Sequence, residues 1–402
     1  MRADWQTAKL GEACQFINGL WKGEEPPFVR VGVIRNTNFA KDGTLDDSDI
    51  AYLDVEAKKF AKRRLQFGDI ILEKSGGGPK QPVGRVVLFD KAQGDFSFSN
   101  FTSAIRVNEP AILNPMYLHR YLHWIYVSGR TEAMQNHSTG IRNLNGDAYK
   151  AITVAFPPIA EQRSIVAMLD EAFEGIAIAK AHAEKNLRNA REVFTGQLER
   201  IFSDPTPGWT QVKLEEIGST QTGSTPRTSE PKNFGSHLPF IKPGDFRRDG
   251  TVNYSNEALS KIGASRSRRV AEGSALMVCI GATIGKAGFT EREVATNQQV
   301  NSWTPTGSTF GKFIYYQMTS MDFQRRVRDG AGQATLPIIN KSKWSALTVV
   351  VPAAVEEQRR IVDELDAIQA ETIALEELYQ RKLAALDEFK QSLLHQAFSG
   401  AL

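Results

Sequence analysis

The chain has 402 residues and a net charge of +3, with 41% hydrophobic and 24% charged residues, a composition typical of a folded protein too long for one hydrophobic core. No apolar stretch reaches the roughly 18 residues of a membrane span, and the sequence from Met1 to Trp5 lacks the apolar run of a signal peptide. These features argue against a transmembrane or secreted protein and predict a cytoplasmic one, while the small net charge alone neither requires nor excludes a nucleic-acid partner.

The sequence contains two copies of one unit. Each copy carries the same landmarks in the same order: a Trp followed by Lys-Leu, a basic pair before a glycine turn, an apolar strand, and a Glu-Gln-Arg motif after a proline. In chain order, the corresponding residues are Trp5 and Trp209, Arg63-Arg64 and Arg268-Arg269, Leu72 and Met277, Gly84-Arg85 and Gly285-Lys286, Ser99-Asn100 and Thr296-Asn297, Ile141 to Asn145 and Leu336 to Asn340, and Glu161-Gln162-Arg163 and Glu357-Gln358-Arg359. A repeat of about 200 residues indicates a duplicated domain rather than a solenoid.

Two globular modules are predicted, at residues 1–157 and 203–352. Both consist of short apolar stretches separated by Gly, Pro, Asn and Asp, which is typical of strands and turns. One helix is expected in each, around residues 115–131 and 309–328. The fold class is therefore predicted to be α+β.

Two long helices are predicted after the modules, at residues 158–202 and 353–402. Their apolar residues recur at alternating spacings of four and three, which places them on one face, here called the seam. The seam residues are Leu169, Phe173, Ile176, Lys180, Ala183, Leu187, Ala190, Phe194 and Ile201, and then Ile361, Leu365, Ile368, Thr372, Leu375, Tyr379, Lys382, Leu386, Phe389 and Leu393. Some forty residues make a helix about 60 Å long.

The seams allow two arrangements. Each helix could pack against its own module, or the two helices could pair as an antiparallel coiled coil that relates the modules by pseudo-two-fold symmetry. The equal lengths and seams favour pairing. Lys180 and Lys382 interrupt the seams and are expected to fix their register. Glu161 and Glu357 stand at the helix starts, where the macrodipole favours an acidic residue.

The loops of both modules carry polar and basic residues suited to DNA. Arg commonly reads guanine and Asn or Gln adenine, whereas Lys and Ser more often contact phosphate. The candidates in the first module are Arg35, Asn36, Asn38, Arg63, Arg64, Lys74, Ser75, Gly76, Gly77, Lys80, Gln81, Arg85, Asn100, Arg142 and Asn143. Those in the second are Thr225, Arg227, Lys242, Asp245, Arg247, Arg248, Arg268, Arg269, Lys286, Asn297, Gln298 and Gln299.

Several candidates also have simpler interpretations. The pair Arg268-Arg269 alone is better explained as solvated surface, and its recurrence as Arg63-Arg64 makes phosphate contact an equally good explanation. The glycines at 76–78 could form a plain flexible turn, and residues 297–299 could satisfy the end of a strand.

No motif indicates catalysis. The stretches at 25–28 and 156–159 resemble the tetrapeptide of amino-methyltransferases but lack its Asp or Asn, and residues 281–287 depart from a phosphate-binding loop in spacing. The histidines form no HExxH pair, so His119 and His123 are not expected to bind a metal. Cys14 and Cys279 are isolated and are expected to be reduced packing residues.

The duplication, the repeated Glu-Gln-Arg helix start, the Gly-Asp-Ile strand at 68–70 and the Gly-Ser-Thr-Pro at 223–226 resemble the specificity subunits of Type I restriction–modification enzymes. This resemblance covers essentially the whole chain. The modules then look like two target-recognition domains, and residues 158–202 and 353–402 look like the central and C-terminal spacers.

The resemblance implies a non-catalytic subunit that reads a bipartite, asymmetric DNA site and assembles with two methyltransferase subunits and two restriction subunits. The helices would set the spacing between half-sites. This chain would hold no cofactor: S-adenosylmethionine is expected on the methyltransferase, and ATP and magnesium on the restriction subunit. Two alternatives stay open, a self-sufficient methyltransferase or nuclease and a coiled-coil scaffold that binds no nucleic acid.

Overall fold

The computed structural model describes residues 5–20, 23–78, 81–138, 141–203, 207–332 and 335–401. None of the helices in these ranges has the length and hydropathy to cross a membrane. The α+β class is confirmed, since short strands and helices alternate in both halves.

The chain divides into two compact units. The first unit contains Met1–His182 and Lys382–Leu402, and the second contains Ala183–Arg381. Two helices of 45 residues, α5 (Ile159–Ser203) and α11 (Val355–Ser399), therefore each contribute a part to both units. Each unit is a globular module together with part of both long helices.

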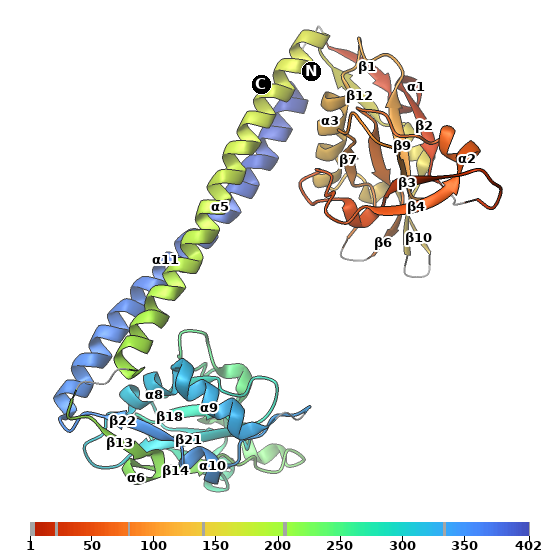
Figure 1. The fold of residues 1–402 in the computed structure, drawn as a ribbon. Helices are drawn as coiled ribbons and strands as arrows, with labels where there is room; N and C mark the ends of the chain where they lie inside the picture. Colours follow the sequence, from red (N-terminus) through yellow and green to blue (C-terminus); the bar gives the residue numbers. More distant parts are fainter. Residues whose placement is uncertain are drawn as a thin grey trace. The chain divides into compact units, whose positions relative to one another are not determined.

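The first module contains β1 to β12 and the helices before α5 (Figure 1). Its strands are β1 (Gln6–Lys9), β2 (Cys14–Asn18), β3 (Phe28–Ile34), β4 (Ala51–Glu56), β5 (Ile70–Glu73), β6 (Ser75–Gly77), β7 (Val86–Leu88), β8 (Phe96–Phe98), β9 (Thr102–Val107), β10 (Gln135–Ser138), β11 (Ile141–Leu144) and β12 (Thr153–Phe156). Its helices are α1 (Leu10–Ala13), η1 (Asn36–Asn38), α2 (Ala57–Ala61), α3 (Pro115–Val127), η2 (Glu132–Met134) and α4 (Gly146–Lys150).

The second module repeats this order. Its strands are β13 (Thr210–Lys213), β14 (Gly218–Thr222), β15 (Phe234–Ile241), β16 (Ala258–Leu259), β17 (Arg269–Val270), β18 (Ala275–Val278), β19 (Ala287–Phe289), β20 (Val294–Thr296), β21 (Val300–Pro305) and β22 (Thr348–Val351). Its helices are α6 (Leu214–Ile217), η3 (Pro231–Asn233), η4 (Pro243–Asp245), α7 (Lys261–Ser265), α8 (Gly311–Thr319), α9 (Met321–Ala331) and α10 (Lys341–Ser345).

The sheets show the same duplication. The order β2-β9-β5-β7 in the first module matches β14-β21-β18-β19 in the second, and the pair β1-β12 matches β13-β22. The first module also has a three-stranded sheet, β10-β11-β6, whose place in the second module is taken by a single bridge between Ile280 and Ile338 among the described residues.

The central strand of each module is buried on both faces. Ile70 and Leu72 of β5 pack in one hydrophobic cluster with α3, whereas Ile71 between them packs in another cluster. In β18, Met277 likewise packs with α8, and Leu276 packs on the opposite side. Side chains alternate across a strand, so an unbroken apolar run of this kind predicts a strand covered on both faces.

One predicted correspondence between the copies is wrong by one residue. The Ser99 amide donates to the Ile34 carbonyl at 2.9 Å, and the Asn297 amide donates to the Ile241 carbonyl at 3.1 Å. Ser99 therefore corresponds to Asn297 and not to Thr296. The preceding strands have only three residues each, too few for their pattern to reveal a shift of one residue.

The helices of the modules depart from their expected ends. α3 stops at Val127, four residues early, because Gly129 adopts φ +74° directly after the C-cap. The helix expected around 309–328 is two helices, because Ser320 is extended and its side chain accepts a hydrogen bond from the Phe323 amide. Ser320 thus ends α8 and caps α9.

The long helices pair antiparallel in the first unit. Lys180 of α5 forms an ion pair with Asp387 of α11, with 2.6 Å between Nζ and Oδ1. Seven residues earlier in α5, the Phe173 ring lies under the ammonium of Lys390, which is three residues later in α11. Lys180 therefore joins the two helices, as expected of a residue that fixes register.

The second unit shows the same antiparallel pairing. Arg191 forms an ion pair with Glu376 at 3.1 Å, and the Gln197 amide donates to Glu364 at 2.6 Å. The Ala190 carbonyl accepts from the hydroxyl of the buried Thr372. Pairing of the helices is thus confirmed within each unit.

The predicted seam is only partly buried. Leu169, Ile176, Ala183 and Ala190, each seven residues apart, are buried. Leu375, Lys382 and Phe389 are exposed, so their assignment to the seam was wrong. Phe173, Lys180, Leu187 and Phe194, which alternate with these residues along α5, are half-buried.

The repeated Glu-Gln-Arg motif fixes the start of each long helix through its glutamine. Gln162 is fully buried; its Oε1 accepts from the Asn114 amide, and its Nε2 donates to the carbonyls of Ile112 and Pro157, all at 2.8 Å. Gln358 forms three equivalent hydrogen bonds at 2.8, 3.1 and 3.3 Å. The motif therefore joins the helix to the segment that precedes α3 or α8.

The far end of each long helix enters the core of a module. In the first unit, Phe398 of α11 packs edge-on against Tyr117 and Tyr121 of α3, with ring centroids 5.3 Å apart in both pairs. In the second unit, Phe202 of α5 packs edge-on against Phe313 of α8 at 5.4 Å. The start of each helix, with Leu169 of α5 and Leu365 of α11, packs against the module that the helix follows, whereas its far end packs against the other module. The helices thus contact their own modules at their starts, and they also pair with each other.

Candidate nucleic-acid interface

Each module has a strained turn where its central strand ends. Gly76 follows β5 with φ +98°, and Gly281 follows β18 with φ +103°, conformations that favour glycine. A Cβ at Gly76 would lie 3.1 Å from Asn36 Nδ2, and a Cβ at Gly281 would lie 3.6 Å from Gln299 Nε2. The turn thus brings the backbone close to polar side chains from other loops.

In the first module a cluster of polar side chains surrounds this turn. The Ser75 hydroxyl donates to Asn143 Oδ1 at 2.5 Å, and Asn36 Nδ2 donates to the Ser75 carbonyl at 2.8 Å. Lys74 Nζ donates to Asn18 Oδ1 at 3.1 Å, and partial burial lowers the pKa of Lys74. We call Asn18, Asn36, Lys74, Ser75 and Asn143 the first cluster. Sequence analysis selected all of these residues except Asn18.

The second module gathers different side chains from its loops after β14 and between β20 and β21. The Thr225 hydroxyl donates to Gln298 Oε1 at 2.5 Å. The Arg268 amide donates to Ser224 Oγ at 3.0 Å. We call Ser224, Thr225, Arg268 and Gln298 the second cluster. Arg268, Thr225 and Gln298 are exposed, so their polar groups are accessible to a ligand.

The first arginine of each basic pair supports the module itself. Arg63 Nε donates to the carbonyl of Asn18, the last residue of β2, at 3.2 Å. Arg268 Nη1 donates to the carbonyl of Thr222, the last residue of β14, at 2.7 Å. The repeat of this arginine in the sequence is therefore explained by a repeated contact inside the module.

The second arginine of each pair also has a repeated partner. Arg64 forms an ion pair with Asp95 at 2.9 Å, and Arg269 forms one with Glu293 at 3.2 Å. Both arginines stay about half exposed. Ion pairs this exposed contribute little stability, so these guanidinium groups can exchange their carboxylate partner for a phosphate.

Some predicted contact residues are buried and shape loops. Asn38 Oδ1 accepts from the Arg35 amide at 2.9 Å, and Asp245 Oδ2 accepts from the Lys242 amide at 2.7 Å. Asn297, also buried, exchanges two hydrogen bonds with Gln299. Asn38, Asp245 and Asn297 position the loops, and the interpretation of residues 297–299 as a strand end agrees with this geometry.

The guanidinium group of Arg85 has its hydrogen-bond partners inside the first module. Its guanidinium forms a two-point ion pair with the buried Glu73 at 2.7 and 2.8 Å and donates to the carbonyls of Phe39 and Asn36. Gln81 lies against the same guanidinium. Arg85 therefore holds the loop that carries Asn36 instead of presenting its charge to solvent.

The remaining candidates are dispersed. Arg35 pairs with Asp49, Arg227 with Glu230, and Lys242 with Glu257. Arg247 and Arg248 line a cavity of about 580 Å³ together with residues of α5 and α11 in the second unit. Gly77 and Arg142 are paired between β6 and β11. Asn100 lies between β8 and β9, and Lys286 is exposed before β19. Lys80 lies outside the described residues.

Exposed apolar residues in these loops were not among the candidates predicted from the sequence. Ile141 and Leu336 correspond in the repeat and have nearly equal exposed fractions, 54% and 55%. Phe101, which adjoins Gly76, and Ile338 are also exposed. The repeat aligns Ile141 with Leu336, and this recurrence of an apolar residue was the sequence feature that could have identified them.

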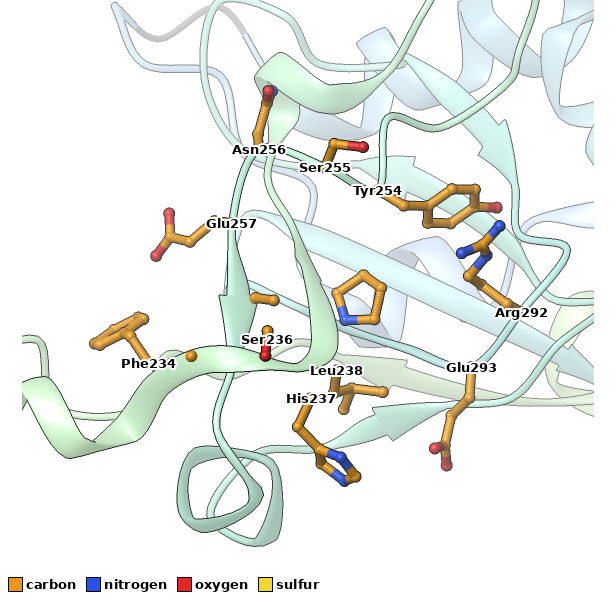
Figure 2. A pocket seen from close by; sticks show the side chains of 13 residues that line it. Phe234, Ser236, His237, Leu238, Tyr254, Ser255, Asn256, Glu257, Arg292 and Glu293 are labelled. Atoms are coloured by element: carbon orange, nitrogen blue, oxygen red, sulfur yellow. The ribbon is translucent and has the colours of Figure 1, made fainter.

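A hollow of about 790 Å³ belongs to the second module (Figure 2). Its charged side chains already have partners: Glu257 pairs with Lys242, Glu293 pairs with Arg269, and Arg292 lies over the Tyr254 ring. The described residues contain no group of three His, Cys, Asp or Glu that could hold a metal ion. The first cluster, beside the glycine turn of its module, and the second cluster remain the best candidates for binding.

Comparison with known proteins gives consistent results along the chain. A family model described as Type I restriction modification DNA specificity domain matches residues 2–187 and 207–385. The specificity subunit of the Type I restriction enzyme HindI from Haemophilus influenzae is 29% identical over 149 residues, which cover 36% of this chain and 32% of that protein. The StySPI specificity subunit from Salmonella potsdam is 21% identical over 434 residues, covering 99% of this chain and 89% of that protein.

The first three relatives, including HindI, are matched over only 32%, 36% and 40% of their own length. Among solved structures, the HsdS subunit from Thermoanaerobacter tengcongensis has a TM-score of 0.65 at 19% identity, covering 100% of this chain and 98% of that one. A chain solved in a study of type I R-M system assembly has a TM-score of 0.80 at 20% identity, covering 100% and 99%. These likenesses show the fold.

Proposed function

The chain belongs to the family described as Type I restriction modification DNA specificity domain, and we propose that it reads a bipartite, asymmetric DNA sequence for a Type I restriction–modification enzyme. In this proposal each module reads one half-site, and α5 and α11 set the number of unspecified base pairs between them. The chain itself carries out no chemistry.

The observation that supports this proposal is a repeated scaffold that carries unlike polar clusters. The two modules share their central sheet order, yet the first cluster contains three asparagines, a lysine and a serine, whereas the second contains a serine, a threonine, an arginine and a glutamine. Base edges are distinguished by their pattern of donors and acceptors. Two modules with different donor and acceptor sets would therefore select two different half-sites.

The partners follow from the same proposal. Because the helix pairing is repeated in both units, we propose that two methyltransferase subunits dock in equivalent ways and that two restriction subunits complete the enzyme. S-adenosylmethionine would be bound by the methyltransferase, and ATP and magnesium by the restriction subunit, in the cytoplasm. The target adenine would be flipped into the methyltransferase for methylation.

A methylation assay with exchanged modules tests the proposal. The full chain and its methyltransferase partner would be incubated with DNA of random sequence, and methylated adenines would be mapped by sequencing. We expect one bipartite motif, and we expect replacement of residues 207–352 by the module of another family member to change one half-site only. Binding should also weaken steeply with salt, because phosphate contacts release counterions.

Three results would contradict the proposal. A change of both half-sites would show that the modules do not read independently. Methylation by the chain without its partner would indicate a self-sufficient methyltransferase. DNA binding without sequence preference, or no binding, would leave the duplicated fold as a scaffold.

A further inference from the structure

One position on the repeated scaffold differs completely in chemistry between the modules. The Leu144 amide donates to the Lys74 carbonyl at 2.8 Å, and the Ile339 amide donates to the Cys279 carbonyl at 3.0 Å. The residues before them, Asn143 and Ile338, therefore occupy the same backbone position. Each lies beside the glycine turn of its module.

The side chains next to this position also differ between the two modules. In the first module Asn143 contacts Ser75, and Ser75 contacts Asn36. The equivalent residues in the second module are Ile338, Ile280 and Pro243, of which Ile280 bridges to Ile338. Three hydrogen-bonding side chains thus correspond to three apolar ones, although the backbone hydrogen bond beside this position is the same in both modules.

The first module holds the Asn143 side chain in one orientation. The Ser75 hydroxyl donates to Oδ1 at 2.5 Å, and the Ser75 backbone is held in turn by Asn36 at 2.8 Å. Within the part of the chain that the structure describes, no hydrogen bond uses the Asn143 NH₂ group. The amide is therefore fixed with its donor group free, which reduces the entropy lost when it binds an acceptor.

The second module presents only hydrocarbon at this position. Ile338 is 45% exposed, and Ile280 beside it is partly exposed. An isoleucine cannot donate a hydrogen bond and would leave a base acceptor unpaired if it covered one. It can instead contact the C5 methyl group of thymine, as apolar side chains do in the major groove.

We propose that residues 143 and 338 are specificity-determining residues of the two modules. Asn143 donates to an acceptor on a base edge, such as purine N7 or thymine O4, and Ser75 is its positioning residue. Ile338 selects an apolar base edge at the corresponding place of the other half-site. This inference rests on the proposed function, because it requires that each module contacts base edges.

The test compares Asn143→Leu and Ile338→Ala in the full chain with its methyltransferase partner. Relative methylation rates would be measured on DNA in which each base pair of both half-sites is varied. For Asn143→Leu we expect discrimination at one base pair of the first half-site to fall about tenfold, the scale of one base contact. For Ile338→Ala we expect the change at one base pair of the second half-site only.

Matched controls use residues outside the clusters. Asn108→Leu, at an exposed asparagine after β9, and Ile262→Ala, at an exposed isoleucine of α7, should leave both half-sites unchanged. Ser75→Ala removes only the orienting hydroxyl and should weaken discrimination at the same base pair as Asn143→Leu, which keeps the test decisive if Asn143→Leu folds poorly.

The proposal is overturned if folded Asn143→Leu or Ser75→Ala keeps full discrimination at every base pair. It is also overturned if methylation falls equally on all sequences, because that result indicates a phosphate contact or a structural role. Failure of the proposed function would look different, since the unmodified chain with its partner would then show no bipartite motif.

Discussion

At the scale of single residues, two histidines of the first unit are placed where protonation is unfavourable. His119 and His123 lie on one face of α3, stacked with ring centroids 6.4 Å apart, and each is almost fully buried. Burial lowers the pKa of His119 to about 3, with further lowering by Arg120 and His123. Burial also lowers the pKa of His123 to about 4, with contributions from Lys390 and Arg120.

These pKa values predict that the first unit loses stability in mild acid. In the unfolded chain both imidazoles titrate near pH 6.5, so above this pH the folded and unfolded states bind the same number of protons. As pH falls from about 6.5 toward 4, only the unfolded state takes up protons, and stability decreases by about 2 kcal/mol per histidine at pH 5. Hydrogen exchange of α3, measured between pH 7.5 and 5 and corrected for intrinsic rates, would show this loss.

A matched pair of variants isolates the effect. His123→Gln should flatten the pH dependence of exchange in α3, because one titrating group is removed. His237→Gln changes an exposed histidine of the second module and should leave α3 unaffected. An equally steep pH dependence in His123→Gln would show that other groups cause it.

At the scale of elements, the start of each long helix depends on one glutamine. The side chain of Gln162 satisfies one amide and two carbonyls that no regular secondary structure pairs. A buried donor or acceptor left without a partner costs roughly 1–3 kcal/mol. The junction between β12, α3 and α5 is therefore sensitive to this side chain.

Replacing Gln162 by leucine should weaken the first unit. The variant keeps much of the volume but leaves the Asn114 amide and the carbonyls of Ile112 and Pro157 unpaired, so we expect a loss of about 3 kcal/mol or more. Denaturant unfolding followed by hydrogen exchange of α3 would measure it. Gln391→Leu, at an exposed position of α11 in the same unit, is the control and should change stability by less than about 0.5 kcal/mol.

The sequence predicted the elements better than the contacts between them. The duplication, the α+β class and the long helices follow from local patterns, so they were accessible before the structure. The repeated Glu-Gln-Arg motif was also recognised, but it was explained by the acidic residue at the helix start. The importance of Gln162 depends on a loop 48 residues earlier in the chain, and no local pattern reveals such a partner.

The candidate site was likewise predicted only in part, because tertiary contacts decide which residues are accessible. Residue type and loop position selected Asn36, Lys74, Ser75 and Asn143, which the structure brings together. The same criteria selected Arg85, whose charge is taken up by a buried glutamate. A solvated arginine and one paired inside a module look alike in sequence, because the difference lies in tertiary contacts.

At the scale of the whole molecule, residues 394–398 of α11 complete the core of the first unit. Leu394, Ala397 and Phe398 of α11 are buried in the hydrophobic cluster that contains Tyr117 and Tyr121 of α3. Since these segments are more than 270 positions apart in the sequence, the first module cannot reach its full core until α11 is made. The second unit consists of residues 183–381.

This dependence predicts that Phe398→Ala destabilises the first unit and spares the second. Phe398 is 4% exposed and contacts three aromatic rings of α3, and truncation of such a buried ring costs about 3–5 kcal/mol. Hydrogen exchange should therefore become faster in α3 and stay unchanged in α8. Phe389→Ala removes a ring that is 52% exposed on the same helix and serves as the control. Equal acceleration in α3 and α8 would show instead that the two units unfold together, so that no part of the chain is stabilised by its C-terminal residues alone.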